Sequence, residues 1–171
     1  MAKKIVKALL GLFGGVLSTT LGKYIFIFIL SLLPILELRG GLIAASLLNL
    51  KAIPSLIVCL IANILIIPVG LFLLDYLFEL LSKSKTLKSG INKWKKSALK
   101  KRKTIDKYGF IGLTLFVGIP LPGTGAWTGS LLAVLLGMDK KKSFIYILLG
   151  VLMAAVIMML VSFGLLKGII N

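Results

Sequence analysis

The stretch Ile119-Pro120-Leu121-Pro122-Gly123-Thr124-Gly125-Ala126-Trp127-Thr128-Gly129 lies in the middle of a long apolar segment. It holds two prolines and three glycines in eleven residues. Such a stretch cannot continue a regular helix, because proline removes a donor and clashes with the preceding turn, and each glycine costs about 1 kcal/mol relative to alanine. Irregular backbone at membrane depth is tolerated only where protein buries it or where it lines a water-filled cavity. The stretch therefore predicts a helix break inside the bilayer that helps to form a binding site.

The composition is that of an all-α integral membrane protein. Of the 171 residues, 58% are hydrophobic, a share that exceeds what a soluble domain needs for its core. There is no histidine, and the single cysteine, Cys59, lies in an apolar run. These residues support no disulfide, no metal, no cofactor and no catalytic set, so we expect no enzymatic activity. The net charge of +16 predicts contact with anionic lipid headgroups rather than with nucleic acid.

Residues 1–171 form a single predicted membrane domain with a weak internal repeat. The apolar segments are 5–22, 24–50, 52–81, 108–138 and 143–168, and a basic stretch, 82–107, separates the first three from the last two. Segments 24–50 and 108–138 each open on Lys-Tyr, reach a proline and then glycines, and are followed by one long apolar segment. The offset between the halves drifts between about 84 and 88 residues. The sequence therefore predicts two repeats, 24–81 and 108–168, after an extra N-terminal helix, 5–22.

The positions of lysine and arginine predict the topology. Residues 82–107 hold eleven of them, and six more lie at Lys3, Lys4, Lys7 and 140–142. If segments 24–50 and 108–138 are re-entrant hairpins, which enter and leave on one face, all seventeen lie in the cytoplasm, as the positive-inside rule requires. Five full spans would put the large basic stretch outside. A rival topology, with an interfacial first helix and four spans, violates the rule only at residues 140–142.

Under the hairpin topology the two repeats have opposite orientation. Inverted repeats with discontinuous helices that meet near the membrane midplane are a recurring architecture of secondary transporters. The predicted fold is thus an inverted repeat of a re-entrant hairpin plus a transmembrane helix, in the plasma (inner) membrane, with the N-terminus and 82–107 in the cytoplasm. A site between the two hairpin tips would be accessible from either face.

Glu37 and Arg39 are the first candidate site residues. They lie with Gly40 at the predicted break of the first hairpin, after Pro34. A charge at the centre of a spanning helix costs on the order of 2.5–3.5 kcal/mol, so it normally faces a cavity or a partner. Glu37 is then a protonatable coupling group, and Arg39 is an anion clamp. The alternative is a structural ion pair that only neutralises two costly charges.

The second break supplies the other candidates. Amides that follow the prolines, together with two hydroxyls, are suited to bind an anion at the N-terminus of a half-helix. The alternative is that the small residues only let helices pack closely, with the tryptophan as an anchor. The candidate substrate-binding residues here are Pro120, Pro122, Gly123, Thr124, Gly125, Trp127 and Thr128.

The remaining signals concern packing, lipid and assembly. Residues 82–107 predict a basic amphipathic helix on the inner leaflet. Asn63 is expected to hydrogen-bond across helices. Asp75 and Glu79, one turn apart, are expected to pair with the basic stretch, and the alternative is that they supply protons. Gly11 and Gly15 form a GxxxG pair, which together with the small size predicts a homodimer.

Two motifs resemble a known family. Glu37-Leu38-Arg39-Gly40-Gly41 in the first half, and the run from Gly118 to Gly129 in the second, resemble the small multidrug export protein family. That family is similar to the DedA (VTT-domain) membrane proteins, which carry two re-entrant hairpins with an embedded acid and arginine. The resemblance implies transport, with proton coupling, and relatives of DedA move polyprenyl-phosphate and other lipids. Arginines expected in the second half of DedA proteins have no counterpart here, since Arg39 and Arg102 are the only two.

Three functional hypotheses follow. The first is a small secondary transporter that exports a small molecule or anionic amphiphile in exchange for protons. The second is a lipid flippase or scramblase, in which the same cavity opens sideways to lipid. The third is a membrane scaffold that does not transport and whose basic helix, 82–107, recruits lipid or partners.

Overall fold

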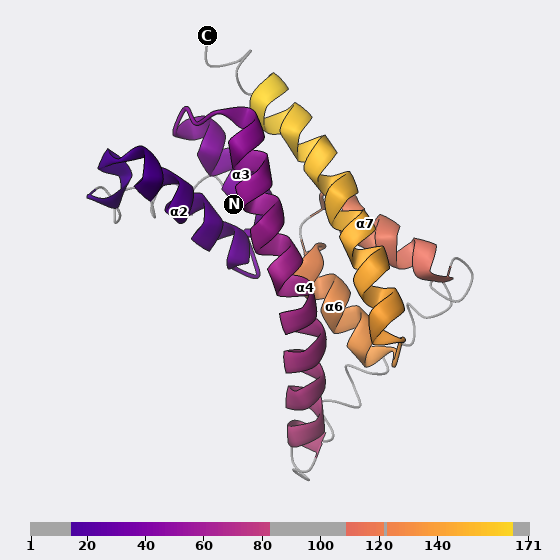
Figure 1. The fold of residues 1–171 in the computed structure, drawn as a ribbon. Coiled ribbons are helices and arrows are strands. Elements are labelled where there is room, and N and C mark those ends of the chain that lie inside the picture. Colours follow the sequence, from indigo (N-terminus) through magenta and orange to yellow (C-terminus); the bar gives the residue numbers. More distant parts are fainter. Residues whose placement is uncertain (1–14, 83–108, 122, 166–171) are drawn as a thin grey trace. The chain divides into compact units, whose positions relative to one another are not determined.

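The computed structural model describes residues 15–82, 109–121 and 123–165, and all the regular structure in these ranges is helical (Figure 1). The elements in chain order are η1 (Val16–Ser18), α2 (Thr20–Leu32), α3 (Glu37–Leu47), α4 (Ala52–Ser82), the short helix Gly109–Gly118, α6 (Ala126–Leu135), α7 (Lys140–Met159) and the π-helix η2 (Leu160–Leu165). The predicted N-terminal helix up to residue 14, Gly11 of the GxxxG pair, the basic helix over 83–107 and Pro122 lie outside the described residues.

The first broken segment consists of α2 and α3, which pack against one another. α2 begins at Thr20 because the Thr19 hydroxyl accepts a hydrogen bond from the Gly22 N–H at 3.0 Å. It therefore begins before Lys23, where the sequence predicts a boundary between segments. α2 ends at Leu32, because Pro34 disfavours helical backbone at the residue before it, and Leu33 is extended.

The second broken segment repeats this plan. The helix Gly109–Gly118 ends just before Pro120, and α6 begins after a break that contains Gly123 and Gly125. Both glycines have positive φ, 80° and 140°. The predicted interruption of the apolar segment 108–138 is confirmed, and it lies within the proline- and glycine-rich stretch 119–129.

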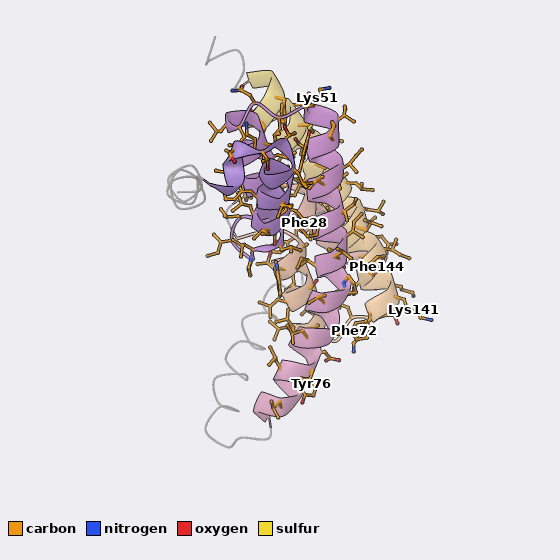
Figure 2. All side chains as sticks on the ribbon, turned by 60° about the vertical axis from the view of Figure 1, so that its left-hand side comes forward. Phe28, Lys51, Phe72, Tyr76, Lys141 and Phe144 are labelled. Carbon is orange, nitrogen blue, oxygen red and sulfur yellow. The ribbon has the colours of Figure 1, made fainter. Side chains whose placement is uncertain are left out.

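Among the described residues, two helices are long and apolar enough to cross a membrane, Ala52–Leu77 within α4 and Lys140–Gly164 within α7 and η2. Only 39% and 33% of their most apolar windows are buried, whereas the core helix of a soluble protein is mostly buried. Phe72 and Tyr76, for example, are 62% and 63% exposed (Figure 2). The exposed apolar side chains follow helical spacing: Ile53, Ile57, Ile61, Leu65, Val69, Phe72 and Tyr76 on α4, and Ile145, Leu149, Leu152, Val156 and Leu160 on α7 and η2.

The chain divides into two compact units that contain the same kinds of helical elements. The first unit holds residues 1–64 and 152–171, and the second holds 65–151. Each unit therefore contains one broken segment, the N-terminal part of the long helix that follows it, and the C-terminal part of the other long helix.

In the first unit, polar contacts and small residues hold α2, α3 and α4 together. The Asn63 amide donates to the carbonyl of Ser31 at 3.1 Å and to that of Cys59 at 3.3 Å, which confirms the predicted bond across helices. The Ser46 hydroxyl donates to the carbonyl of Ser162 at 2.6 Å and so ties α3 to η2. Both donors are buried, where an unpaired polar group would be costly.

In the second unit, glycines bring the helices into close contact. A Cβ at Gly150 of α7 would lie 2.7 Å from the Thr114 carbonyl oxygen, so α7 approaches the helix Gly109–Gly118 at its backbone. The Thr114 hydroxyl donates to the Tyr146 carbonyl at 2.9 Å, and the Phe110 and Tyr146 rings stack at 4.9 Å. Asp75 forms an ion pair with Lys140 at the start of α7. Its described partner is thus a lysine outside the basic stretch.

The ends of α3 and α6 are built alike. After α3, Asn49 has φ 54°, its N–H donates to Ser46, and the Leu50 N–H donates to Ala45. After α6, Gly137 has φ 64°, its N–H donates to Val134, and the Met138 N–H donates to Ala133. Both are Schellman motifs. Asn49 and Gly137 are 88 positions apart, as are the first residues of α4 and α7, Ala52 and Lys140.

Candidate functional site

Glu37 is the most unusual residue of the first break. It is the first residue of α3, it is only 5% exposed, and its φ is 48°. Its N–H donates to the Leu33 carbonyl at 2.9 Å, which closes the turn over Pro34. Left-handed backbone costs a residue with a side chain roughly 1–2 kcal/mol, and such strain clusters at functional sites. A buried acid held in a strained turn is therefore a strong candidate for a functional group.

Arg39 lies two residues further, in the first turn of α3. It is half-buried, and its guanidinium interacts electrostatically with the Glu37 carboxylate. The N-terminus of a helix favours an acid and disfavours a base, so the helix dipole supports Glu37 and opposes Arg39. The carboxylate therefore compensates for an arginine in an unfavourable place, and the two charges form one electrostatic unit.

Gly40 has a packing role. A Cβ at this position would lie 2.6 Å from the Leu36 Cβ, so only glycine fits the turn in which the Gly40 N–H donates to the Leu36 carbonyl at 2.7 Å. Leu36 itself is buried. Gly40 thus lets the break close tightly beneath Glu37, and its predicted contact with a substrate stays a prediction.

The hydroxyls of the second break are engaged with the break itself. The Thr124 hydroxyl lies 2.8 Å from the Ile119 carbonyl and 2.9 Å from that of Leu121. The Thr128 hydroxyl donates to the Gly125 carbonyl at 3.3 Å. These bonds satisfy carbonyls that a continuous helix would have paired. An anion at this break would therefore depend on backbone amides rather than on these two hydroxyl protons.

Gly123, Gly125 and Trp127 have distinct positions in the second break. Gly123 is exposed with open space around it, whereas Gly125 is buried at φ 140° and ψ −167°, a region restricted to glycine. Trp127 is half-buried and lies beside Gly70 of α4, with its Cε3 atom 4.0 Å from where a Gly70 Cβ would be. Pro120 is half-buried at the end of the preceding helix.

The candidate residues thus form two clusters. Glu37, Arg39 and Gly40 belong to the first compact unit, and the described residues of 120–128 belong to the second. Within each cluster the residues lie at a helix break, next to the N-terminus of a short helix. In the described ranges, no three His, Cys, Asp or Glu side chains gather in a way that could hold a metal ion.

The residues that brace each helix break were not among the site residues predicted from the sequence. Gly41 lies against Ser31 and Cys59, and Gly70 lies against Ser130, whose hydroxyl is 3.5 Å from the Ile67 carbonyl. Each is a small residue at a helix contact. Small residues at helix spacing in apolar segments are the signal for such contacts.

The described residues define a helical protein with two apolar helices that are long enough to cross a bilayer, as integral membrane proteins have. The chain belongs to the protein family described as "Putative small multi-drug export protein", which matches over residues 37–157, more than half of the sequence. This match begins at Glu37, directly after the first break, and includes the whole of the second break. Searches of curated proteins and of solved structures found no significant match.

Proposed function

We propose that this protein is a small secondary transporter of the inner membrane that exports a small molecule or anionic amphiphile in exchange for protons. In the proposed architecture α4 and α7 span the bilayer, and the two broken segments are re-entrant hairpins of an inverted repeat. The observation that carries the proposal is Glu37, a buried acid with left-handed backbone at a helix break within the matched family region.

Helix length supports the re-entrant hairpins. At 1.5 Å per residue, the 13 residues of α2 extend about 20 Å and the 10 residues of α6 about 15 Å. The hydrocarbon core of a bilayer is about 30 Å thick, so such helices cross only about half to two-thirds of it. The helix Gly109–Gly118 is equally short. Helices of this length, paired around a break, suit segments that enter and leave on one face.

Contacts within the second unit support opposite directions for α4 and α7. Lys140, at the start of α7, contacts Phe72 and Asp75 in the C-terminal half of α4. One turn further along α7, Phe144 shares a cavity with Pro68, which lies one turn earlier in α4. The two helices therefore run antiparallel in this unit. If both span the membrane, the chain between them begins and ends on one side, as a re-entrant segment 109–135 requires.

The charges agree with this orientation. The same contacts bring residues 140–142 to the end of α4 from which the basic stretch 82–107 continues. Fourteen lysines and arginines then share one side, which the positive-inside rule makes the cytoplasm.

A second candidate function is lipid movement, as in a flippase or scramblase. At both breaks the residues that flank the first proline are apolar and exposed: Leu33 and Ile35 at 40% and 84%, and Ile119 and Leu121 at 44% and 56%. An apolar rim beside a charged group is suited to a substrate with both an acyl chain and a headgroup. A transport rate that requires a lipid headgroup on the substrate and does not depend on the proton gradient would favour this function.

Cysteine labelling tests the topology. In a Cys59→Ser background, single cysteines are placed at Thr20, Lys51, Ser89 and Asp139. Thr20, Lys51 and Asp139 are exposed and therefore accessible to the reagent. We expect a membrane-impermeant maleimide to label Ser89→Cys and Asp139→Cys only from the cytoplasm and the other two only from outside. Labelling of Asp139→Cys from outside would contradict the re-entrant hairpin.

Transport in proteoliposomes tests the coupling. Vesicles carry a pH-sensitive dye, and ethidium is supplied as the probe substrate. We expect ethidium-driven proton movement with the wild type and with Lys51→Gln, an exposed control, and none with Glu37→Gln. If Glu37→Gln transports with an unchanged pH dependence, Glu37 is not the coupling group.

A further inference from the structure

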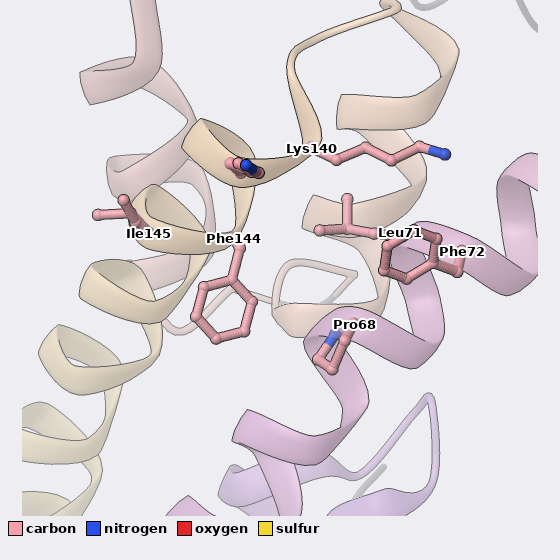
Figure 3. Close-up of a pocket in the computed structure, with 7 residues that line it drawn as sticks. Pro68, Leu71, Phe72, Lys140, Phe144 and Ile145 are labelled. Carbon is pink, nitrogen blue, oxygen red and sulfur yellow. The ribbon is translucent and has the colours of Figure 1, made fainter.

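A cavity of about 350 Å³ lies between α4 and α7 in the second unit, and none of its lining residues belongs to either helix break (Figure 3). On the α4 side it is lined by Pro68, Leu71 and Phe72. Leu71 is buried and forms part of the core, while Phe72 is 62% exposed and belongs to the apolar stripe of α4. The cavity therefore opens on the apolar face that the two long helices present outward.

The α7 side combines apolar walls with cations. Phe144 and Ile145 continue the apolar lining, and Lys140 stands at one end of it (Figure 3). Lys141 is a further lining residue. Ile145 is 53% exposed and belongs to the apolar stripe of α7. The lining surface is almost wholly apolar, so the two lysines contribute their aliphatic stems to it and their ammonium groups lie outside the lining. An apolar cavity flanked by lysine ammonium groups suits the acyl chain and the phosphate of a phospholipid.

The three lysines 140–142 lie at the N-terminus of α7, where the helix dipole disfavours positive charge. The N-terminus of a helix carries partial positive charge, so three consecutive lysines in the first turn of α7 are electrostatically unfavourable. Asp75 pairs with Lys140, which also lies 4.9 Å from the Phe72 ring centroid, and Lys142 lies 5.9 Å from that of Phe110. Asp139, directly before the lysines, accepts a hydrogen bond from the Lys142 N–H at 2.8 Å. Asp75 and Asp139 thus offset two of the three lysine charges, and an anion at the exposed Lys141 would offset the third.

We infer that this cavity binds one anionic phospholipid. Its phosphate lies at Lys140 and Lys141, and an acyl chain lies against Pro68, Leu71 and Phe144. Basic pockets between membrane helices on the cytoplasmic side are suited to anionic headgroups. The inference takes the membrane setting and orientation from the proposed function but does not depend on transport, because the lining residues include neither Glu37 nor any residue of the second break.

Native mass spectrometry of the full-length protein in detergent tests this inference. The protein is titrated with phosphatidylglycerol and, separately, with phosphatidylcholine of the same acyl chains. Each lysine near an anionic lipid is worth about a factor of five in affinity, so Lys141→Gln should weaken phosphatidylglycerol binding about fivefold. Lys142→Gln, one residue further but outside the cavity, is the matched control and should change it little. Both lysines are exposed, so neither substitution disturbs the core.

Asp75→Asn gives a test of opposite sign. Removal of this carboxylate releases Lys140 and adds one net positive charge at the cavity, so phosphatidylglycerol should bind more tightly. Glu37→Gln should bind lipid as the wild type does, which separates this inference from the transport proposal. Equal losses in Lys141→Gln and Lys142→Gln would overturn it, as would equal binding of the two lipids. Displacement by millimolar glycerol 3-phosphate would instead identify a site for soluble anions.

Discussion

Gly41 of α3 lies directly against Cys59 of α4, so closely that a Cβ on the glycine would stand 2.7 Å from the Cys59 Sγ. It would also collide with the Ser31 hydroxyl of α2. The second unit contains the corresponding contact, since a Cβ on Gly129 of α6 would lie 3.5 Å from Ile147 of α7. Gly41 and Gly129 are 88 positions apart, and so are Cys59 and Ile147. In each half, a glycine at the equivalent position therefore lies where the second short helix of the broken segment contacts the long helix that follows.

Gly41→Ala and Gly129→Ala should each destabilise the protein. In both cases the added methyl group has no space, since it would lie 2.5 Å from the Val117 Cγ2 in the second unit and nearer still to Ser31 in the first. Overpacking of this kind typically costs 1–3 kcal/mol. The midpoint of thermal unfolding in detergent, followed by tryptophan fluorescence, measures the effect. Gly164→Ala is the control, because nothing lies within 4 Å of its Cβ. An equal shift in all three variants would refute the packing role.

Glu37→Gly should be more stable than Glu37→Ala by about 1 kcal/mol. Both variants lose the carboxylate, but alanine keeps the Cβ that makes φ 48° unfavourable, whereas glycine does not. The comparison uses thermal midpoints of the two variants side by side, and both should lack proton coupling. Identical midpoints would show that the backbone at Glu37 is not strained.

Gly125→Ala tests the position that corresponds to Glu37 in the second half, 88 residues later. Its φ of 140° and ψ of −167° exclude a side chain, so alanine must shift the start of α6. We expect a lower thermal midpoint and a loss of transport together. Retention of both in Gly125→Ala would mean that the break tolerates ordinary backbone.

The two Schellman motifs predict effects of different size. Gly137→Ala adds a Cβ at positive φ, where the cost is roughly 1–2 kcal/mol, whereas Asn49→Ala should cost less, because Asn49 already carries a Cβ there and loses only its polar group. Because there is open space around the Cβ position of Gly137, the loss of stability in Gly137→Ala measures backbone strain alone. Asn49→Gly keeps the left-handed turn and should leave the midpoint almost unchanged. A lower midpoint for Asn49→Gly than for Asn49→Ala would argue against this account.

Asn63→Leu should destabilise the first unit moderately. The substitution removes the amide bonds to the carbonyls of Ser31 and Cys59 while it keeps side-chain volume. Hydrogen bonds between membrane helices average about 0.6 kcal/mol and reach about 1.7 kcal/mol. Thermal midpoints compare this variant with Ile61→Ala, on the exposed stripe of α4, which should matter less. A larger loss for Ile61→Ala would show that the amide bonds contribute little.

Much of the helical organisation could be read from the residues. Pro34, Pro120 and the glycines after them predict the breaks, because their effect on the backbone is local. The long apolar runs predict α4 and α7 for the same reason. Two local expectations needed adjustment: α2 begins at Thr20, where the Thr19 cap outweighs the charge at Lys23, and Asp75 pairs with Lys140. The second difference is a contact between residues far apart in sequence, which no local pattern encodes.

The apolar helices, the positions of both breaks and the charge asymmetry follow from the residues alone, because these features depend on each residue's own backbone and solvation preferences. The packed fold was needed to show that Glu37 takes left-handed backbone and is buried, that Thr124 bonds to its own break, and that glycines 88 positions apart make equivalent contacts. These features depend on which side chains meet across helices. Spacing along one chain does not specify such meetings, because several helix faces offer similar apolar surfaces and packing selects among them.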